Sequence, residues 1–196
     1  MNPRSNKTLR AALLHAATAT ALACGLLNPA VAQTPLKIGF IATMSGPGGA
    51  LGQDQYDAFM LAIEQRGGKL GGVPVTVIKE DDQLKPDVGV QAATKLLQSD
   101  KVDIITGVTF SNVMMAIHKP ITDAQVFFIG SNAGPAPIAG KDCSEFFFST
   151  SWDNDMLHEA GGQLTNDLGY KNVYVMAANY QAGRDAASGF KRNFKG

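Results

Sequence analysis

Small hydroxyl and amide side chains gather where three expected strands end. They are Ser45, Thr109, Ser111, Ser131 and Asn132, and each stands close to the start of an expected helix. Hydroxyl groups, backbone N–H groups and the positive end of a helix dipole can together hold a carboxylate without a buried arginine. For any single residue, simple helix capping is an equally good interpretation. Three such loops on one sheet edge favour an anion-binding site.

The glycine-rich loop at 43–52 does not fit a nucleotide-binding motif. Leu51 occupies the position of the third glycine of the dinucleotide fingerprint, and Glu80 and Asp81 lie well beyond the spacing of its ribose-binding acid. The Walker A pattern is absent from the sequence as well. We therefore expect no dinucleotide and no other cofactor.

No set of residues has the spacing of catalytic machinery. There is no G-x-S-x-G elbow, and His118 and His158 fall on expected helices as exposed or partly packed side chains. Asp81 and Asp82 are expected to cap and polarise the following helix. Cys143 belongs to no CxxC motif or His/Cys/Asp/Glu cluster, which favours a small buried residue or a residue whose partner lies outside the chain, with a reactive thiol as the alternative. The sequence predicts neither an enzyme nor a metal site.

The first 32 residues have the pattern of a cleaved secretory signal. A basic start precedes an apolar stretch at 11–27, and the small-x-small pattern 30–32 follows Pro29. We expect cleavage after Ala32 and export to the periplasm. Cys24 offers a weaker alternative, lipoprotein anchoring, because the residues before it only loosely resemble a lipoprotein cleavage site.

Removal of the signal segment changes the charge balance. The segment holds three of the 17 basic residues and none of the 17 acidic residues, so the mature part carries a net charge of −3. No basic cluster remains, which argues against nucleic acid or an anionic membrane as partner. A small-molecule ligand fits this surface better.

Short apolar runs alternate with amphipathic helical stretches in the mature part. We expect strands at 36–42, 73–78, 102–106, 126–129 and 146–148, with helices between them and Pro120 bending or shortening one helix. Nearly all-apolar strands in this order predict an α/β fold, a doubly wound parallel sheet with helices on both faces. Right-handed crossovers then place the loops at 43–52, 108–112 and 131–134 on its carboxyl edge, where such folds bind ligands.

A second lobe is expected to begin after residue 152. Leu157, Ala160, Leu164 and Leu168 form a helical stripe, 171–177 reads as a strand, and 182–194 reads as another helix. These elements are too few to cover a second core, so we expect an incomplete lobe of a longer product.

Five segments resemble the leucine/isoleucine/valine-binding type of periplasmic receptor. They are 36–52, 81–97, 102–107, 143–155 and 179–190, and they occur in the family's order over nearly the whole mature chain. The resemblance implies the type I fold, with two α/β lobes that enclose a ligand between them. It places the first lobe at 33–148, a hinge crossing at 149–152 and the start of the second lobe at 153–196. It also implies an ABC permease of the inner membrane as partner.

The same resemblance assigns candidate ligand contacts. Ser111 would supply hydroxyl or amide contacts to a ligand carboxylate, Ser131 and Ala133 would act in the same way from the next loop, and Tyr180 would close over the ligand from the second lobe. The resemblance favours a branched-chain or other hydrophobic amino acid, or a related small carboxylate.

The loop at 131–135 departs from that of amino-acid receptors and looks more like relatives that bind aromatic carboxylates. Phe110, Trp152 and Tyr180 near the expected cleft would suit a flat ligand. Packing in the hinge or core is an equal alternative for Phe110 and Trp152. A ligand sensor with the same fold is an alternative to transport.

Overall fold

The computed structural model describes residues 33–196, so the expected signal segment and Cys24 lie outside the described residues. Thr34–Gly196 forms one compact unit. Its elements are β1 (Leu36–Ala42), η1 (Gly46–Gly48), α2 (Gly49–Gln65), β2 (Lys69–Leu70), β3 (Val73–Asp81), α3 (Pro86–Lys95), η2 (Leu96–Asp100), β4 (Ile104–Gly107), α4 (Ser111–Asp123), β5 (Phe127–Gly130), α5 (Ala136–Ala139), β6 (Phe147–Ser149), α6 (Asn154–Asp167) and α7 (Gln181–Asn193).

The strands form a six-stranded sheet in the order β2-β3-β1-β4-β5-β6. The short β2 pairs antiparallel with β3, and every other neighbouring pair is parallel. Parallel strands joined by crossovers bring their carboxyl ends to one edge. The expected α/β sheet is therefore confirmed, and the loops that follow β1, β3, β4 and β5 meet along one rim.

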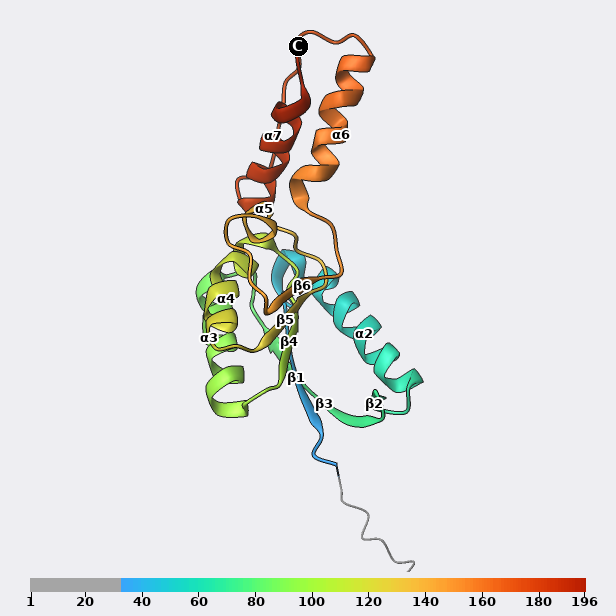
Figure 1. The fold of residues 1–196 in the computed structure, drawn as a ribbon, viewed down its shortest axis with the longest axis vertical. Helices are drawn as coiled ribbons and strands as arrows, with labels where there is room; N and C mark the ends of the chain where they lie inside the picture. The colour runs from blue at the N-terminus through green and yellow to red at the C-terminus, as the bar shows by residue number, and fades with distance from the viewer. Residues whose placement is uncertain (1–32) are drawn as a thin grey trace, which may run out of the picture. The chain divides into compact units, whose positions relative to one another are not determined.

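Helices cover both faces of the sheet, α2 on one face and α3 with α4 on the other (Figure 1). Apolar strand residues and the apolar side of α4 make the main core, whose largest fully buried members include Ile105, Val113, Met114, Ile117 and Phe128. Under α2, the Phe40 ring lies 5.3 Å from the Tyr56 ring and 5.2 Å from the Phe59 ring. Burial of each such side chain contributes about 1.5–3 kcal/mol.

The glycine-rich segment after β1 is largely helical, which the sequence did not predict. The helix α2 begins at Gly49, well inside the expected loop. A side chain at Gly52 would overlap the carbonyl oxygen of Thr43, so a glycine lets α2 approach the end of β1. Pro120 was expected to bend or shorten its helix, and α4 is not shortened there, since it continues to Asp123. Buried Ile121 anchors that last turn.

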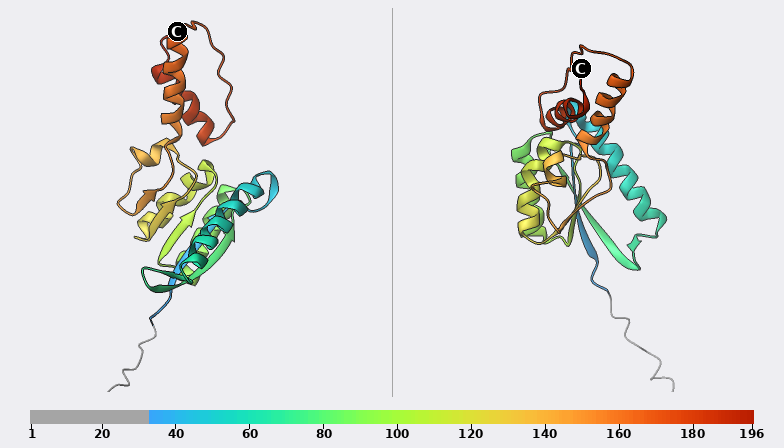
Figure 2. Two further views of the ribbon diagram at one scale, coloured as in Figure 1. Left: turned by 90° about the vertical axis from the view of Figure 1, so that its right-hand side faces the viewer. Right: turned by 45° about the horizontal axis from the view of Figure 1, so that its top comes forward.

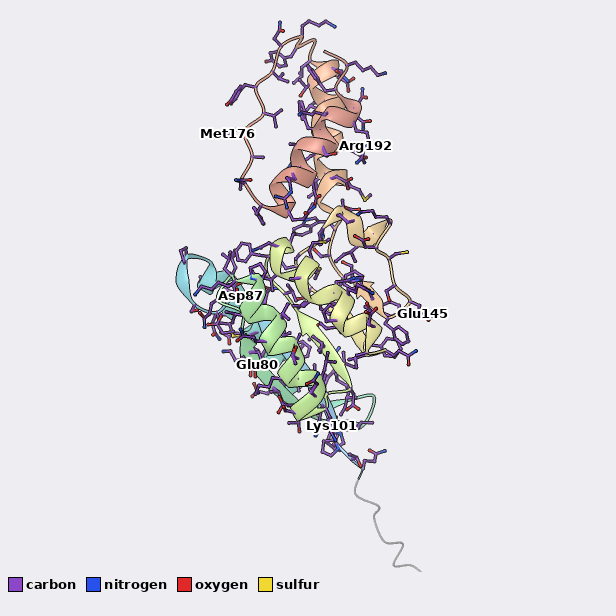
Figure 3. All side chains as sticks on the ribbon, turned by 90° about the vertical axis from the view of Figure 1, so that its left-hand side faces the viewer. Glu80, Asp87, Lys101, Glu145, Met176 and Arg192 are labelled. Carbon is purple, nitrogen blue, oxygen red and sulfur yellow. The ribbon has the colours of Figure 1, made fainter. Side chains whose placement is uncertain are left out.

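The expected strand at 171–177 is not formed. Residues 170–178 have no regular secondary structure and join α6 to α7 as an exposed extended segment (Figure 2). Tyr174 is 93% exposed, and Met176, labelled in Figure 3, is 88% exposed. The sequence has strand character, but a strand needs a neighbour to receive its backbone hydrogen bonds, and none of the described strands pairs with it.

The helices α6 and α7 pack side by side (Figure 1). Arg192 of α7 joins them through ion pairs with Asp155, at 2.7 Å, and with Glu159. The expected apolar stripe of α6 is present but uncovered, since Leu157 and Leu164 are each 58% exposed. Within residues 33–196, no helix combines the length and the apolar character that crossing a membrane requires.

Candidate ligand-binding site

The end of β1 is fastened to the end of β3 by two aspartates. Asp82 is fully buried, and its Oδ1 accepts hydrogen bonds from Thr43 Oγ1 at 2.5 Å and from the Leu84 N–H at 2.8 Å. Burial raises the pKa of this carboxyl above its ordinary value. The expectation that this pair caps the next helix is wrong, because the N-cap residue of α3 is Lys85 and both aspartates bond to the loops instead.

Ser45 belongs to the same junction. Burial alone would raise the pKa of Asp81, but the Ser45 side chain beside it and the hydrogen bonds that its carboxylate accepts from the Met44 and Gln83 amides hold that pKa below its ordinary value. Ser45 precedes η1 but makes no capping bond through its side chain. Ser45 therefore lies beside a protein carboxylate.

The backbone at the end of β4 adopts a conformation that valine rarely takes. Gly107 has φ 109° and Val108 has φ 66°, and Val108 is fully buried. A left-handed non-glycine residue costs about 1–2 kcal/mol. Two hydrogen bonds hold it in place: the Val108 N–H donates to Ile41 O at 2.6 Å, and Val108 O accepts from the Ala133 N–H at 3.2 Å. Strain retained in this way is typical of binding sites.

This turn aims the chain into α4 with Ser111 as its first residue. Ser111 is 2% exposed, and its Oγ accepts a hydrogen bond from Asn154 Nδ2 at 3.0 Å. Among the described residues, its hydroxyl hydrogen has no acceptor, and the Ser111 and Asn112 amides have none either. These groups lie at the positive end of a 13-residue helix.

Two other expected donors are engaged with α2. Thr109 Oγ1 accepts from the Thr43 N–H at 3.1 Å and donates to Gln55 Oε1 at 2.7 Å. Gln55 Nε2 in turn donates to Ser131 Oγ at 3.0 Å, and the Ser131 hydroxyl donates to Gly107 O at 3.2 Å. Capping is therefore not the role of either hydroxyl, and both link the loops of the rim.

Asn132 and Ala133 complete the loop after β5. Asn132 Nδ2 donates to Thr109 O at 2.8 Å, and the Ala133 amide is the donor to Val108 O described above. The Asn132 side-chain amide and the Ala133 N–H, which were expected to bind a ligand, therefore stabilise the turn after β4 instead.

The aromatic candidates separate into two places. The Phe110 and Tyr180 rings meet edge to face with centroids 6.3 Å apart, so the start of α7 reaches the rim beside Ser111. Trp152, 54% exposed, lines a different feature, an apolar groove of about 600 Å³ between α5 and α6. Its other wall includes Ile138 and Phe147.

Two polar residues that the sequence did not single out join α6 and α7 to the rim. Asn154 Nδ2 donates to Asp185 Oδ2 at 3.1 Å as well as to Ser111, and the same Oδ2 accepts from the Ala136 N–H at 3.2 Å. Asn154 is 8% exposed and Asp185 is 6% exposed. Asn154 is the first residue of α6 and Asp185 lies in the second turn of α7, and only the fold brings the two side chains together.

The histidines and the described cysteine stand apart from the rim. His118 is buried, contrary to expectation, with its ring edge-on to Phe147 at 5.2 Å, and burial lowers its pKa. His158 is exposed, and Cys143 is an exposed free thiol, not the small buried residue that was one expectation. No group of three or more His, Cys, Asp or Glu side chains in residues 33–196 is placed to hold a metal ion.

Comparison with known proteins relates the chain to solute receptors. Residues 35–196 match the family model described as periplasmic binding protein. A Leu/Ile/Val-binding protein of Rhizobium johnstonii is 24% identical over 177 residues, which are 89% of this chain and 47% of that protein. The chain thus spans about half the length of the curated relatives that it matches.

Solved structures give the same result. A solute-binding protein of an ABC transporter from R. palustris, in complex with benzoate, is 33% identical with a TM-score of 0.78, over 82% of this chain and 45% of that one. Another, from Rhodopseudomonas palustris BisB5 in complex with 3,4-dihydroxybenzoic acid, is 29% identical with a TM-score of 0.75, over 82% and 44% of the two chains. These matches confirm the resemblance and the fold expected from the sequence.

Proposed function

The chain belongs to the periplasmic binding protein family, and from that premise we propose that it forms one side of the ligand site of an exported solute receptor serving an ABC importer. Within this proposal, residues 33–148 are the first lobe, 149–152 a hinge crossing and 153–196 the start of the second lobe. The mature chain would act outside the inner membrane and would pass its solute to a permease, without transforming it.

One observation supports the proposal most directly. Ser111 presents a hydroxyl hydrogen and α4 presents two amides, at the positive end of the helix, with no acceptor in residues 33–196. A carboxylate placed there would accept three charge-assisted hydrogen bonds. Because Ser111 is buried under Asn154, ligand entry requires α6 and α7 to move away from the rim and return, which is a hinge motion.

Two ligand classes fit this geometry. An aliphatic amino acid is supported by the names of the curated relatives. An aromatic carboxylate is supported by the Phe110–Tyr180 ring pair beside Ser111 and by the benzoate and dihydroxybenzoate bound to the two solved relatives. Flat rings stack or meet edge to face with such a pair, whereas an aliphatic side chain only fills its volume.

An NMR-detected titration of the ¹⁵N-labelled chain tests the proposal, because it measures weak as well as tight binding. The probes are L-leucine, L-isoleucine, benzoate and 4-hydroxybenzoate. We expect saturable binding of one class, and a Ser111→Ala variant should bind that probe about tenfold more weakly through loss of one charge-assisted hydrogen bond.

Ser149→Ala is the matched control, because the Ser149 hydroxyl makes only local exposed contacts with Ser151: it donates to Ser151 O at 3.4 Å and accepts from the Ser151 N–H at 3.2 Å. It should bind as the wild type does. The proposal fails if none of the four probes binds, or if Ser111→Ala binds with unchanged affinity.

A further inference from the structure

Gln55 occupies an unusual place on α2. It lies four residues before Phe59 and eight before Ile63, so it shares the face of the helix that packs on the sheet. Its side chain is half-buried and hydrogen bonds to no residue of its own helix among those described. Instead its two ends reach the loops after β4 and β5.

The two ends of this amide have opposite roles. The Gln55 oxygen accepts the Thr109 hydroxyl hydrogen, and the Gln55 nitrogen donates to the Ser131 oxygen. Thr109 already receives the Thr43 N–H, and the Ser131 hydrogen is directed at Gly107 O. Each hydroxyl is therefore fixed in direction, and neither has a hydrogen left for a ligand.

Ser111 differs from both. Its oxygen accepts from Asn154, and its hydrogen has no acceptor in the described part of the chain. Of the three hydroxyl groups on the loops after β4 and β5 expected to bind an anion, one is free to donate and two are tied to α2.

We propose that Gln55 is a positioning residue, which ties Thr109 and Ser131 to α2 and so leaves Ser111 as the hydroxyl donor for the ligand. This inference rests on the proposed function for the binding step. It assigns Thr109 and Ser131 an indirect part: they hold the strained Gly107–Val108 turn that aims the start of α4.

Single and double variants of Gln55, Thr109 and Ser111 test whether the Thr109–Gln55 hydrogen bond supports ligand binding. Thr109→Val and Gln55→Leu each break the same Thr109–Gln55 link, so each should weaken benzoate, or the best-bound probe, about fivefold to tenfold by loosening the turn. Because the two changes share the Thr109–Gln55 hydrogen bond, the double variant should lose less binding free energy than the sum of the two single variants. Ser111→Ala, which removes a ligand contact, should weaken binding further when it is combined with Gln55→Leu.

Gln53→Leu is the matched control on the same helix. Gln53 bonds only to Asp57 and Lys79, both away from the rim, so its loss should change the dissociation constant less than twofold.

A second readout needs no ligand. Thr109 is 3% exposed, so its hydrogen-bonded hydroxyl proton should exchange slowly enough with water to give an NMR resonance. Gln55→Glu keeps an acceptor oxygen for that proton and should retain the resonance. Gln55→Leu should lose it, while Gln53→Leu should leave it unchanged.

The outcomes separate the two claims. If the wild type binds but Gln55→Leu matches Gln53→Leu, or if Thr109→Val and Gln55→Leu are additive, the inference is overturned and the proposed function stands. Additivity would mean that Thr109 and Gln55 affect binding independently of the hydrogen bond between them. If the wild type binds no probe, the proposed function is wrong, and the role of Gln55 in ligand binding is wrong as well, regardless of the Thr109 hydroxyl resonance.

Discussion

The Asn154 side chain links the rim to the α6–α7 pair, and its removal should give a measurable loss of stability. Asn154→Ala deletes the hydrogen bonds to Ser111 Oγ at 3.0 Å and to Asp185 Oδ2 at 3.1 Å. A neutral hydrogen bond contributes about 1 kcal/mol, and one to a charged group about 1.5–3 kcal/mol. Asp185 keeps the Ala136 amide and the Gln181 side chain, so it is not left unpaired. We expect a loss of about 2.5–4 kcal/mol in the free energy of unfolding.

Urea denaturation followed by tryptophan fluorescence suits this measurement. Trp152 is the single tryptophan of the sequence and lies two residues before Asn154, so its emission reports on this junction. Gln163→Ala is the control on the same helix, since its only side-chain partner is exposed Asp167, and it should stay within about 0.5 kcal/mol of the wild type. If Asn154→Ala costs no more than Gln163→Ala, the described contact does not hold α6 to the rim.

Three further changes follow from the same structure. Gly134→Ala should prevent stable folding, because its methyl group would overlap the Trp152 carbonyl oxygen, and a normal melting temperature would contradict this backbone contact. Burial, together with Asp155, raises the pKa of Asp153 to about 6, so the folded protein should lose stability as pH rises from about 4 to 6 and this carboxyl ionises. Asp153→Asn should remove that pH dependence and should raise the free energy of unfolding at pH 8 by about 1 kcal/mol, after allowance for solvent screening. Urea titrations at several pH values would measure both effects. Burial lowers the pKa of His118, so below about pH 6.5 the unfolded chain binds a proton that the folded chain does not, and the free energy of unfolding should fall. His118→Leu should abolish that fall. A variant with the same pH profile as the wild type would contradict this role of His118.

Local pattern was sufficient where the composition of a segment decides its structure, even when its partners are distant in the chain. The strand Leu36–Ala42 was predicted at its observed bounds, because a short, mostly apolar run is typical of a strand buried on both faces, and its last five residues are indeed buried. The rim was also predictable, since it follows from the order of strands and helices alone.

Sequence reasoning failed where a distant contact decides the outcome. The segment 171–177 has strand character yet remains unpaired, because pairing is a property of two segments and not of one. The hydroxyl of Thr109 looked identical to that of Ser111, and only the position of Gln55 distinguishes them. A signal for Gln55 did exist: a glutamine falls in step with Phe59 and Ile63, where an apolar residue is the usual choice.

The central claim is that the start of α4 holds the carboxylate of the solute, and amide chemical shifts observed during a benzoate titration test it most directly. The account predicts that the Ser111 and Asn112 amides, whose hydrogens have no acceptor in residues 33–196, move furthest and saturate together. Shifts that are largest around Trp152, in the apolar groove beside α6, with Ser111 unmoved, would contradict it.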